Sequence, residues 1–153
     1  MKVLKFTVLL IVLLMLVACI PWFYDQSITF HNNSACEVYI DLGLISRDMG
    51  GTLYPDTSIS KTKVGVPVPQ RGSCHYSYSS DKKDEFKKNG TLSLFIFDAD
   101  TFNLCSWEEI QKDYKILQRY DISYENIKAL KYHITYPPTE AMKDVKMYPS
   151  YEQ

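Results

Sequence analysis

The sequence lacks an excess of positive charge, because 17 Lys and Arg residues stand against 18 Asp and Glu residues. It also lacks a basic stripe, which a protein needs in order to bind nucleic-acid phosphates. Glycine is scarce, with 6 residues in 153, and the chain has no glycine-rich phosphate loop, nucleophile elbow or HExxH zinc motif. These absences exclude a nucleic-acid-binding protein and leave no catalytic constellation. We therefore expect a protein that is not an enzyme and has no cofactor.

The longest hydrophobic run lies at the N-terminus. Lys2 and Lys5 precede an apolar stretch over residues 6–17, and the letters LVAC end the run at Cys19. This order of basic, apolar and small residues is typical of a secretory signal peptide. The ending resembles the lipobox of bacterial lipoproteins. The resemblance implies that residues 1–18 are a cleaved signal peptide and that Cys19 carries diacylglycerol and an acyl group such as palmitate, so that the protein is tethered to a membrane.

An uncleaved membrane-spanning helix and an ordinary cleaved signal are the alternatives. Residues 6–24 are nearly all apolar or aromatic. However, Pro21 interrupts a helix near its end, and the purely apolar part is about a dozen residues, which is shorter than the ~20 that a bilayer span requires. The lipid anchor is the favoured interpretation.

The residues after Cys19 refine the expected location. Ile20 is not the aspartate that keeps such lipoproteins in the inner membrane under the enteric sorting rule, so the resemblance implies the outer membrane. The letters IPWFYDQ also lack the acidic run that exports some lipoproteins to the cell surface, which favours a position facing the periplasm. Residues 19–26 are then a lipid-anchored linker.

Three further cysteines remain in an oxidising compartment, where one disulfide and one free thiol are expected. They are Cys36, Cys74 and Cys105, and three pairings are possible. If the strands alternate up and down, Cys36 and Cys74 lie at the same end of the sheet. We therefore expect a disulfide between Cys36 and Cys74.

Alternating polar and apolar residues predict a mainly β domain over residues 27–138. Runs over residues 27–31 and 37–42 predict an antiparallel hairpin, and residues 61–66 predict a third strand. Residues 91–97 are apolar on both faces, as in a central buried strand. We expect an antiparallel β-sandwich of six or seven strands.

The hydrophobic period changes after residue 105. Ser106 and Glu109 form a capping-box pattern at the start of a helix, and apolar residues follow at helical spacing. A second short helix is expected after Ser123, so a helical insertion precedes the last strand, which residues 132–136 predict. Residues 139–153 carry no lasting pattern and are expected to form a mobile C-terminal tail.

Four segments together resemble a known group of proteins. They are ITFHNNS, LSLFIFDADT, WEEIQKDYKILQRYDIS and YHITYP. The combination is similar to uncharacterised small lipoproteins of Gram-negative gut bacteria and covers nearly the whole chain after the leader. The resemblance implies an envelope location and carries over neither an activity nor a catalytic residue.

Asp98 and Asp100 follow the predicted central strand and are the best-placed pair of carboxylates. A calcium ion could use both, but calcium requires roughly six to eight oxygen ligands, and the remainder of an EF-hand loop does not follow. Asp98 and Asp100 are therefore weak metal candidates, and we expect them to bond amides of the following turn.

The thiols and imidazoles form no evident site. Cys74 and His75 are adjacent, but neighbouring strand residues point to opposite faces. Cys105 precedes a helix start, which favours the thiolate, yet a disulfide or buried thiol is the simpler interpretation. His31, His75 and His133 lie far apart without metal-ligand spacing, so each is expected to be a residue of a sheet surface.

The expected function is that of an envelope lipoprotein with a non-enzymatic protein-binding or structural role. The alternative is a glycan-binding module, because aromatic rings on one sheet surface can stack on sugars. The candidate rings are Trp107, Tyr76, Tyr78, Tyr132 and Tyr136. Against this, Tyr132 and Tyr136 share a face with Ile134 and are expected in the core, and Trp107 is expected to pack on the sheet.

Overall fold

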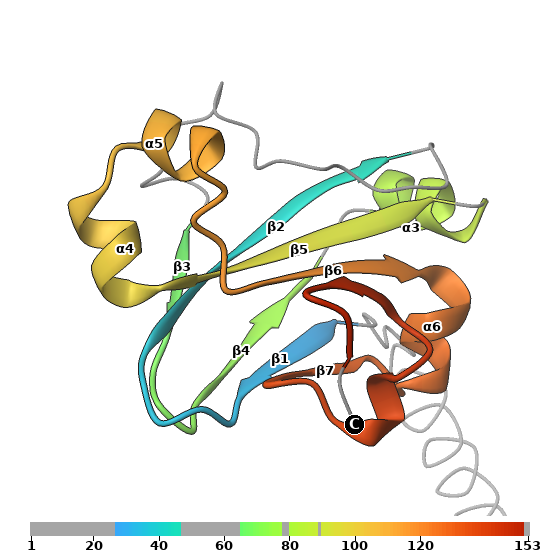
Figure 1. The fold of residues 1–153 in the computed structure, drawn as a ribbon. Coiled ribbons are helices and arrows are strands. Elements are labelled where there is room, and N and C mark those ends of the chain that lie inside the picture. The colour runs from blue at the N-terminus through green and yellow to red at the C-terminus, as the bar shows by residue number, and fades with distance from the viewer. Residues whose placement is uncertain (1–26, 47–64, 78–79, 89, 152–153) are drawn as a thin grey trace, which may run out of the picture.

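The computed structural model describes residues 27–46, 65–77, 80–88 and 90–151, although not the side chains of residues 44–46 and 80–82. This part of the chain is mainly β, with eight strands in two sheets and several short helices (Figure 1). The strands are β1 (Ile28–Asn32), β2 (Val38–Ser46), β3 (Val66–Val68), β4 (Ser73–Tyr76), β5 (Thr91–Asp98), β6 (Gln118–Ser123), β7 (His133–Tyr136) and β8 (Lys146–Tyr148). The helices are α3 (Ser80–Lys87), α4 (Ala99–Leu104), α5 (Trp107–Lys112), α6 (Tyr124–Ala129) and the 3₁₀ helix η1 (Glu140–Met142).

The larger sheet has the strand order β3-β2-β5-β6-β8, and all its pairs are antiparallel. The smaller sheet has the order β4-β1-β7, in which β1 pairs antiparallel with β4 but parallel with β7. The predicted two-sheet β class is confirmed, with two differences. Eight strands are present instead of six or seven. One pair is parallel, because β7 reaches β1 through a long crossover that includes most of the larger sheet, and no hairpin sets its direction.

The first two strands do not form the predicted hairpin, because β1 belongs to the smaller sheet and β2 to the larger one. Asn32 ends β1 and is fully buried. Its side-chain amide donates to the carbonyl oxygens of Cys36 at 2.8 Å and of Val68 at 3.0 Å. Since Val68 lies in the larger sheet, these bonds hold the chain where it crosses from one sheet to the other. The sequence alternation identified both strands but could not reveal this crossing.

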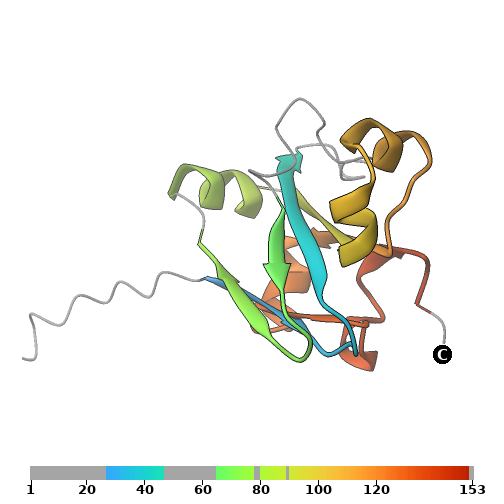
Figure 2. The same ribbon diagram turned by 90° about the vertical axis from the view of Figure 1, so that its left-hand side faces the viewer.

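The two sheets enclose one core, to which both contribute their inner faces. Its fully buried members include Ile28, Ile40, Leu94, Ile96, Tyr120, Ile122 and Ile134. A second cluster lies on the outer face of the larger sheet, where Phe102, Trp107 and Ile110 from α4 and α5 cover Phe95 and Phe97 of β5. In Figure 2, α4 and α5 lie on the side of the larger sheet away from β1 and β4. This double covering confirms that β5 is the central buried strand.

The starts of two helices agree with the capping patterns in the sequence. Ser106 and Glu109 form the capping box at the start of α5, and a second box starts α6, where the Ser123 side chain accepts from the amide of Asn126. However, α5 ends at Lys112. Tyr114 has a φ of 50°, so the helix does not continue along the apolar residues whose spacing is helical. The chain instead enters β6, a strand that the sequence analysis missed.

Two boundaries from the sequence analysis are wrong. Residues 61–64 of the predicted third strand lie outside the described ranges, and β3 continues past its predicted end at residue 66 through Pro67. Proline is tolerated there because β3 is an edge strand. Residues 139–151, expected to belong to a mobile tail, form η1 and β8 instead, and bury Val145 and Met147 in the main core. The folded domain therefore extends past residue 138.

A hydrogen bond across the core joins the two sheets. Tyr120 on β6 is fully buried, and its hydroxyl donates to the carbonyl oxygen of Thr135 on β7 at 2.9 Å. Burial raises the pKa of Tyr120 far above its usual value, so the hydroxyl stays a donor. We expect Tyr120→Phe to lower the free energy of unfolding by about 1–2 kcal/mol, because the ring remains and the carbonyl loses its donor. Urea denaturation measures this difference. Tyr148→Phe is the control, since Tyr148 is 54% exposed; an equal loss in both variants would contradict the role of the bond.

Candidate functional site

Of the two carboxylates that follow β5, one has a local structural role. Asp98 is the N-cap of α4, and its Oδ2 accepts a hydrogen bond from the backbone N–H of Thr101 at 3.0 Å. Asp100 lies exposed in the first turn of that helix. Within the described ranges, no three His, Cys, Asp or Glu side chains converge in a way that could hold a metal ion. The expected bond to a local amide is confirmed for Asp98.

Cys36, Cys74 and Cys105 form no disulfide in this structure. The disulfide expected between Cys36 and Cys74 is therefore not formed, and the reason is topological. That pairing assumed strands alternating up and down in one sheet, whereas Cys36 lies in the crossing between the sheets and Cys74 lies on β4, opposite Phe30. Partial burial raises the pKa of the Cys74 thiol, and Lys115 Nζ donates to Cys105 Sγ at 3.5 Å.

The aromatic rings considered for sugar stacking are largely used in packing. Trp107 is 6% exposed and lies edge-on to Phe97, with ring centroids 5.6 Å apart. Tyr76, Tyr132 and Tyr136 are half-buried and pack against the main core, while residue 78 lies outside the described ranges. The interpretation of Trp107, Tyr132 and Tyr136 as packing residues is confirmed.

The structure brings the three histidines to one sheet. In the register of the smaller sheet, Thr29 of β1 is opposite His75 of β4 and His133 of β7, and His31 lies two residues further along β1. Sequence spacing could not reveal this grouping, because it depends on which strands become neighbours of β1.

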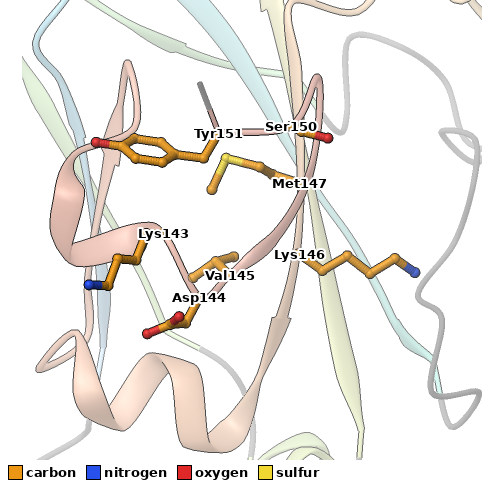
Figure 3. A pocket seen from close by; sticks show the side chains of 7 residues that line it. All are labelled: Lys143, Asp144, Val145, Lys146, Met147, Ser150 and Tyr151. Carbon is orange, nitrogen blue, oxygen red and sulfur yellow. The ribbon is translucent and has the colours of Figure 1, made fainter. Parts of the chain in front are cut away.

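The C-terminal segment borders an open surface hollow of about 530 Å³. Figure 3 shows the residues that line it, which are Lys143, Asp144, Val145, Lys146, Met147, Ser150 and Tyr151. Val145 and Met147 are buried beneath it, and the half-buried Tyr151 ring forms one wall. Lys146 points away from the other side chains in Figure 3. We call this feature the C-terminal hollow.

A second surface feature lies beside the hollow, on the other face of β8. Tyr114, Leu117, Arg119 and Tyr148 make up this edge patch. Tyr148 is 54% exposed and Leu117 is 39% exposed. The rings of Tyr114 and Tyr148 meet edge to face at 5.3 Å, and Arg119 Nη1 donates to the Tyr114 hydroxyl at 3.0 Å. Burial raises the pKa of Tyr114. Apolar and aromatic surface is thus held in a defined geometry.

Buried charges anchor the edge patch to the sheet. Asp121 on β6 is 4% exposed and pairs with Arg119 Nη2 at 3.3 Å and with Lys146 Nζ of β8 at 3.5 Å. Its Oδ1 also accepts from the Ser93 hydroxyl of β5 at 3.1 Å. This network therefore links three adjacent strands beneath the patch.

A further bond fixes the chain just after β8, where the side-chain amide of Gln118 donates to the carbonyl oxygen of Pro149 at 2.7 Å. Because β8 is an edge strand of the larger sheet, it presents backbone groups on its outer side. The C-terminal edge, comprising β8, the C-terminal hollow and the edge patch, is a preformed surface.

Sequence reasoning missed this surface because residues 139–153 were interpreted as a tail. The available signal was the alternation of Val145 and Met147 with Lys146 and Tyr148, which is a half-buried strand pattern. Four residues of alternation are too few to distinguish a strand from chance.

The comparisons identify no relative: no protein family, no curated protein and no solved structure matches this chain. Among the residues that the structure describes, no helix is long and apolar enough to cross a membrane. Cys19 and the hydrophobic N-terminal run lie outside those residues.

Proposed function

We propose that this protein is a non-enzymatic envelope lipoprotein, anchored in the outer membrane through Cys19 and facing the periplasm, that binds another envelope protein through its C-terminal edge. The anchor is supported by the leader that ends at Cys19. The single observation that carries the binding role is the exposure of Leu117 and Tyr148 beside the C-terminal hollow.

The C-terminal edge has the features of a protein-binding surface. Tyrosine is enriched in the centres of protein interfaces, and the exposed Tyr148 belongs to the edge patch. An edge strand can also accept an extended segment of a partner by backbone pairing, while a neighbouring pocket receives a side chain. The ion network and the bond from Gln118 hold this surface in place, so this chain loses little conformational entropy when it binds a partner.

The glycan-binding alternative has less support. It depends on exposed ring faces, and the four described rings among its candidates are buried or half-buried. These four offer little stacking surface. Protein binding is therefore the better-supported proposal.

Site-specific photo-crosslinking in intact cells tests the binding role. A benzophenone amino acid at position 148 is expected to give a discrete protein adduct of this chain. The same amino acid at position 66 is the matched control, because Val66 is also exposed, at 42%, but lies on β3 at the opposite edge of the same sheet. Identical patterns from both positions, or no adduct from position 148, would count against the proposal.

Once the adduct identifies the partner, its affinity can be measured with substituted chains. We expect Tyr148→Ala to weaken binding by roughly 30-fold, since removal of a central interface aromatic typically costs about 2 kcal/mol or more. Val66→Ala should leave the affinity unchanged within about twofold. Isothermal titration calorimetry with the purified partner provides the comparison, and equal effects of the two substitutions would place the interface elsewhere.

A further inference from the structure

The outer face of the smaller sheet carries a pair of histidines in direct contact. Along β1, Ile28 and Phe30 point into the core, so Thr29 and His31 point outward. His31 Nε2 lies 2.9 Å from His133 Nδ1, and the two ring planes are 20° apart with centroids 5.2 Å apart, so the rings lie side by side and meet nitrogen to nitrogen. His31 is half-buried and His133 is exposed. The two side chains are separated by 102 positions in the sequence.

This contact constrains the protonation of both rings. A hydrogen bond between two imidazole nitrogens requires one nitrogen to donate and the other to accept. At least one ring is therefore neutral. The pKa of His31 is lowered by its burial, and further by His133 on β7 and His75 on β4. Neutral imidazole is the form that binds metal ions.

We propose that His31 Nε2 and His133 Nδ1 form a binding site for a divalent transition-metal ion of the nickel, copper and zinc class. Imidazole suits these metals. Two imidazole nitrogens at about 2.0–2.1 Å from a tetrahedral ion lie about 3.3 Å apart. Starting from the observed 2.9 Å, the nitrogens must open by a few tenths of an ångström, and both rings must also turn so that their lone pairs, which now face each other, converge on an ion beside the N···N line. The proton that the two nitrogens share then leaves to solvent.

The other residues of this sheet face decide how many protein ligands the site has. His75 is exposed on the neighbouring strand β4, but its Nδ1 is hydrogen-bonded to Thr29 Oγ1 at 3.1 Å. No third ligand from the described residues completes the set, so the site has two protein ligands and positions open to water or an added ligand. An ion there would connect β1 to β7, the one parallel pair of the smaller sheet.

Nickel titration of the full chain in detergent, with thiols kept reduced, tests the proposal. Isothermal titration calorimetry at about pH 7.5, above the usual histidine pKa, should show one ion per chain. His31→Gln and His133→Gln should each weaken binding at least about tenfold, because each removes a ligand. Lowering the pH to about 5.5 should also weaken it, because protonated imidazole cannot bind the ion.

Two matched controls isolate the pair. His75→Gln removes the third histidine of the face and should change the nickel affinity by less than about twofold. Cys36→Ser removes the exposed thiol and should also change the nickel affinity by less than about twofold. As a second measurement, nickel should raise the thermal unfolding midpoint of the unsubstituted chain and of His75→Gln, but not of His31→Gln, because only bound metal stabilises the fold. If either histidine variant fails to fold, the other provides the same test. The proposal is overturned if nickel does not bind, if His31→Gln and His133→Gln bind it as tightly as the unsubstituted chain, or if His75→Gln loses as much affinity as they do.

Discussion

Replacing Cys19 with serine is expected to remove the protein from the outer-membrane fraction. The variant should also lack the mass that the acyl groups add to the unsubstituted protein. The reason is that acyl chains bury methylene groups at ~0.8 kcal/mol each, and two or more chains make the attachment nearly permanent. Outer-membrane fractionation and intact-mass spectrometry measure both effects. The unsubstituted product should begin at Cys19 and carry the mass of its acyl groups.

The matched control is Cys36→Ser, which removes a different thiol and should leave both readouts unchanged. Two outcomes would contradict the anchor. One is an intact leader on the unsubstituted protein, and the other is an undiminished amount of the serine variant in the outer-membrane fraction. Either would also remove the basis for the proposed location.

Asp121→Ala is expected to lower the free energy of unfolding by about 3–5 kcal/mol, which is the usual consequence of removing one partner of a buried ion pair. Asp121 is 4% exposed and Arg119 is 7% exposed, so the guanidinium would keep a charge in a site that has lost its carboxylate. Chemical denaturation followed by circular dichroism measures the loss.

Lys146→Ala is the control for Asp121→Ala. The Lys146 side chain is 59% exposed, and exposed ion pairs contribute only about 0–1 kcal/mol. The Lys146 variant should therefore stay within about 1 kcal/mol of the unsubstituted chain. A comparably small loss for Asp121→Ala would mean that the buried network does not stabilise the C-terminal edge.

The most predictable parts of this fold are those whose signals are local. Ser106 and Glu109 sit three residues apart and satisfy each other's backbone groups, so their pattern alone identifies the start of α5. The strand over residues 91–97 was equally clear, since apolar residues on both faces require covering on both faces. β8 was missed because a strand of three residues has no statistical signature, and β6 was missed because the apolar residues before it have helical spacing.

The candidate sites were less predictable than the fold class. Residues 139–153 lacked a lasting pattern, so Tyr148 and the C-terminal hollow could not be anticipated. Their structure depends on pairing with β6 and on the buried Asp121. The disulfide prediction failed for a related reason, because it rested on a strand order that sequence alternation does not contain.

The sequence by itself determined the mainly β class, the capped helix starts and the expectation of a lipid anchor at Cys19, because each of these depends on neighbouring residues or on a contiguous run. Only the tertiary structure decided that β1 leaves β2 for the other sheet, that β7 lies parallel to β1, and that His31 meets His133. Such contacts depend on how the two sheets share one core, and the free energy of that packing is spread over residues far apart in the chain.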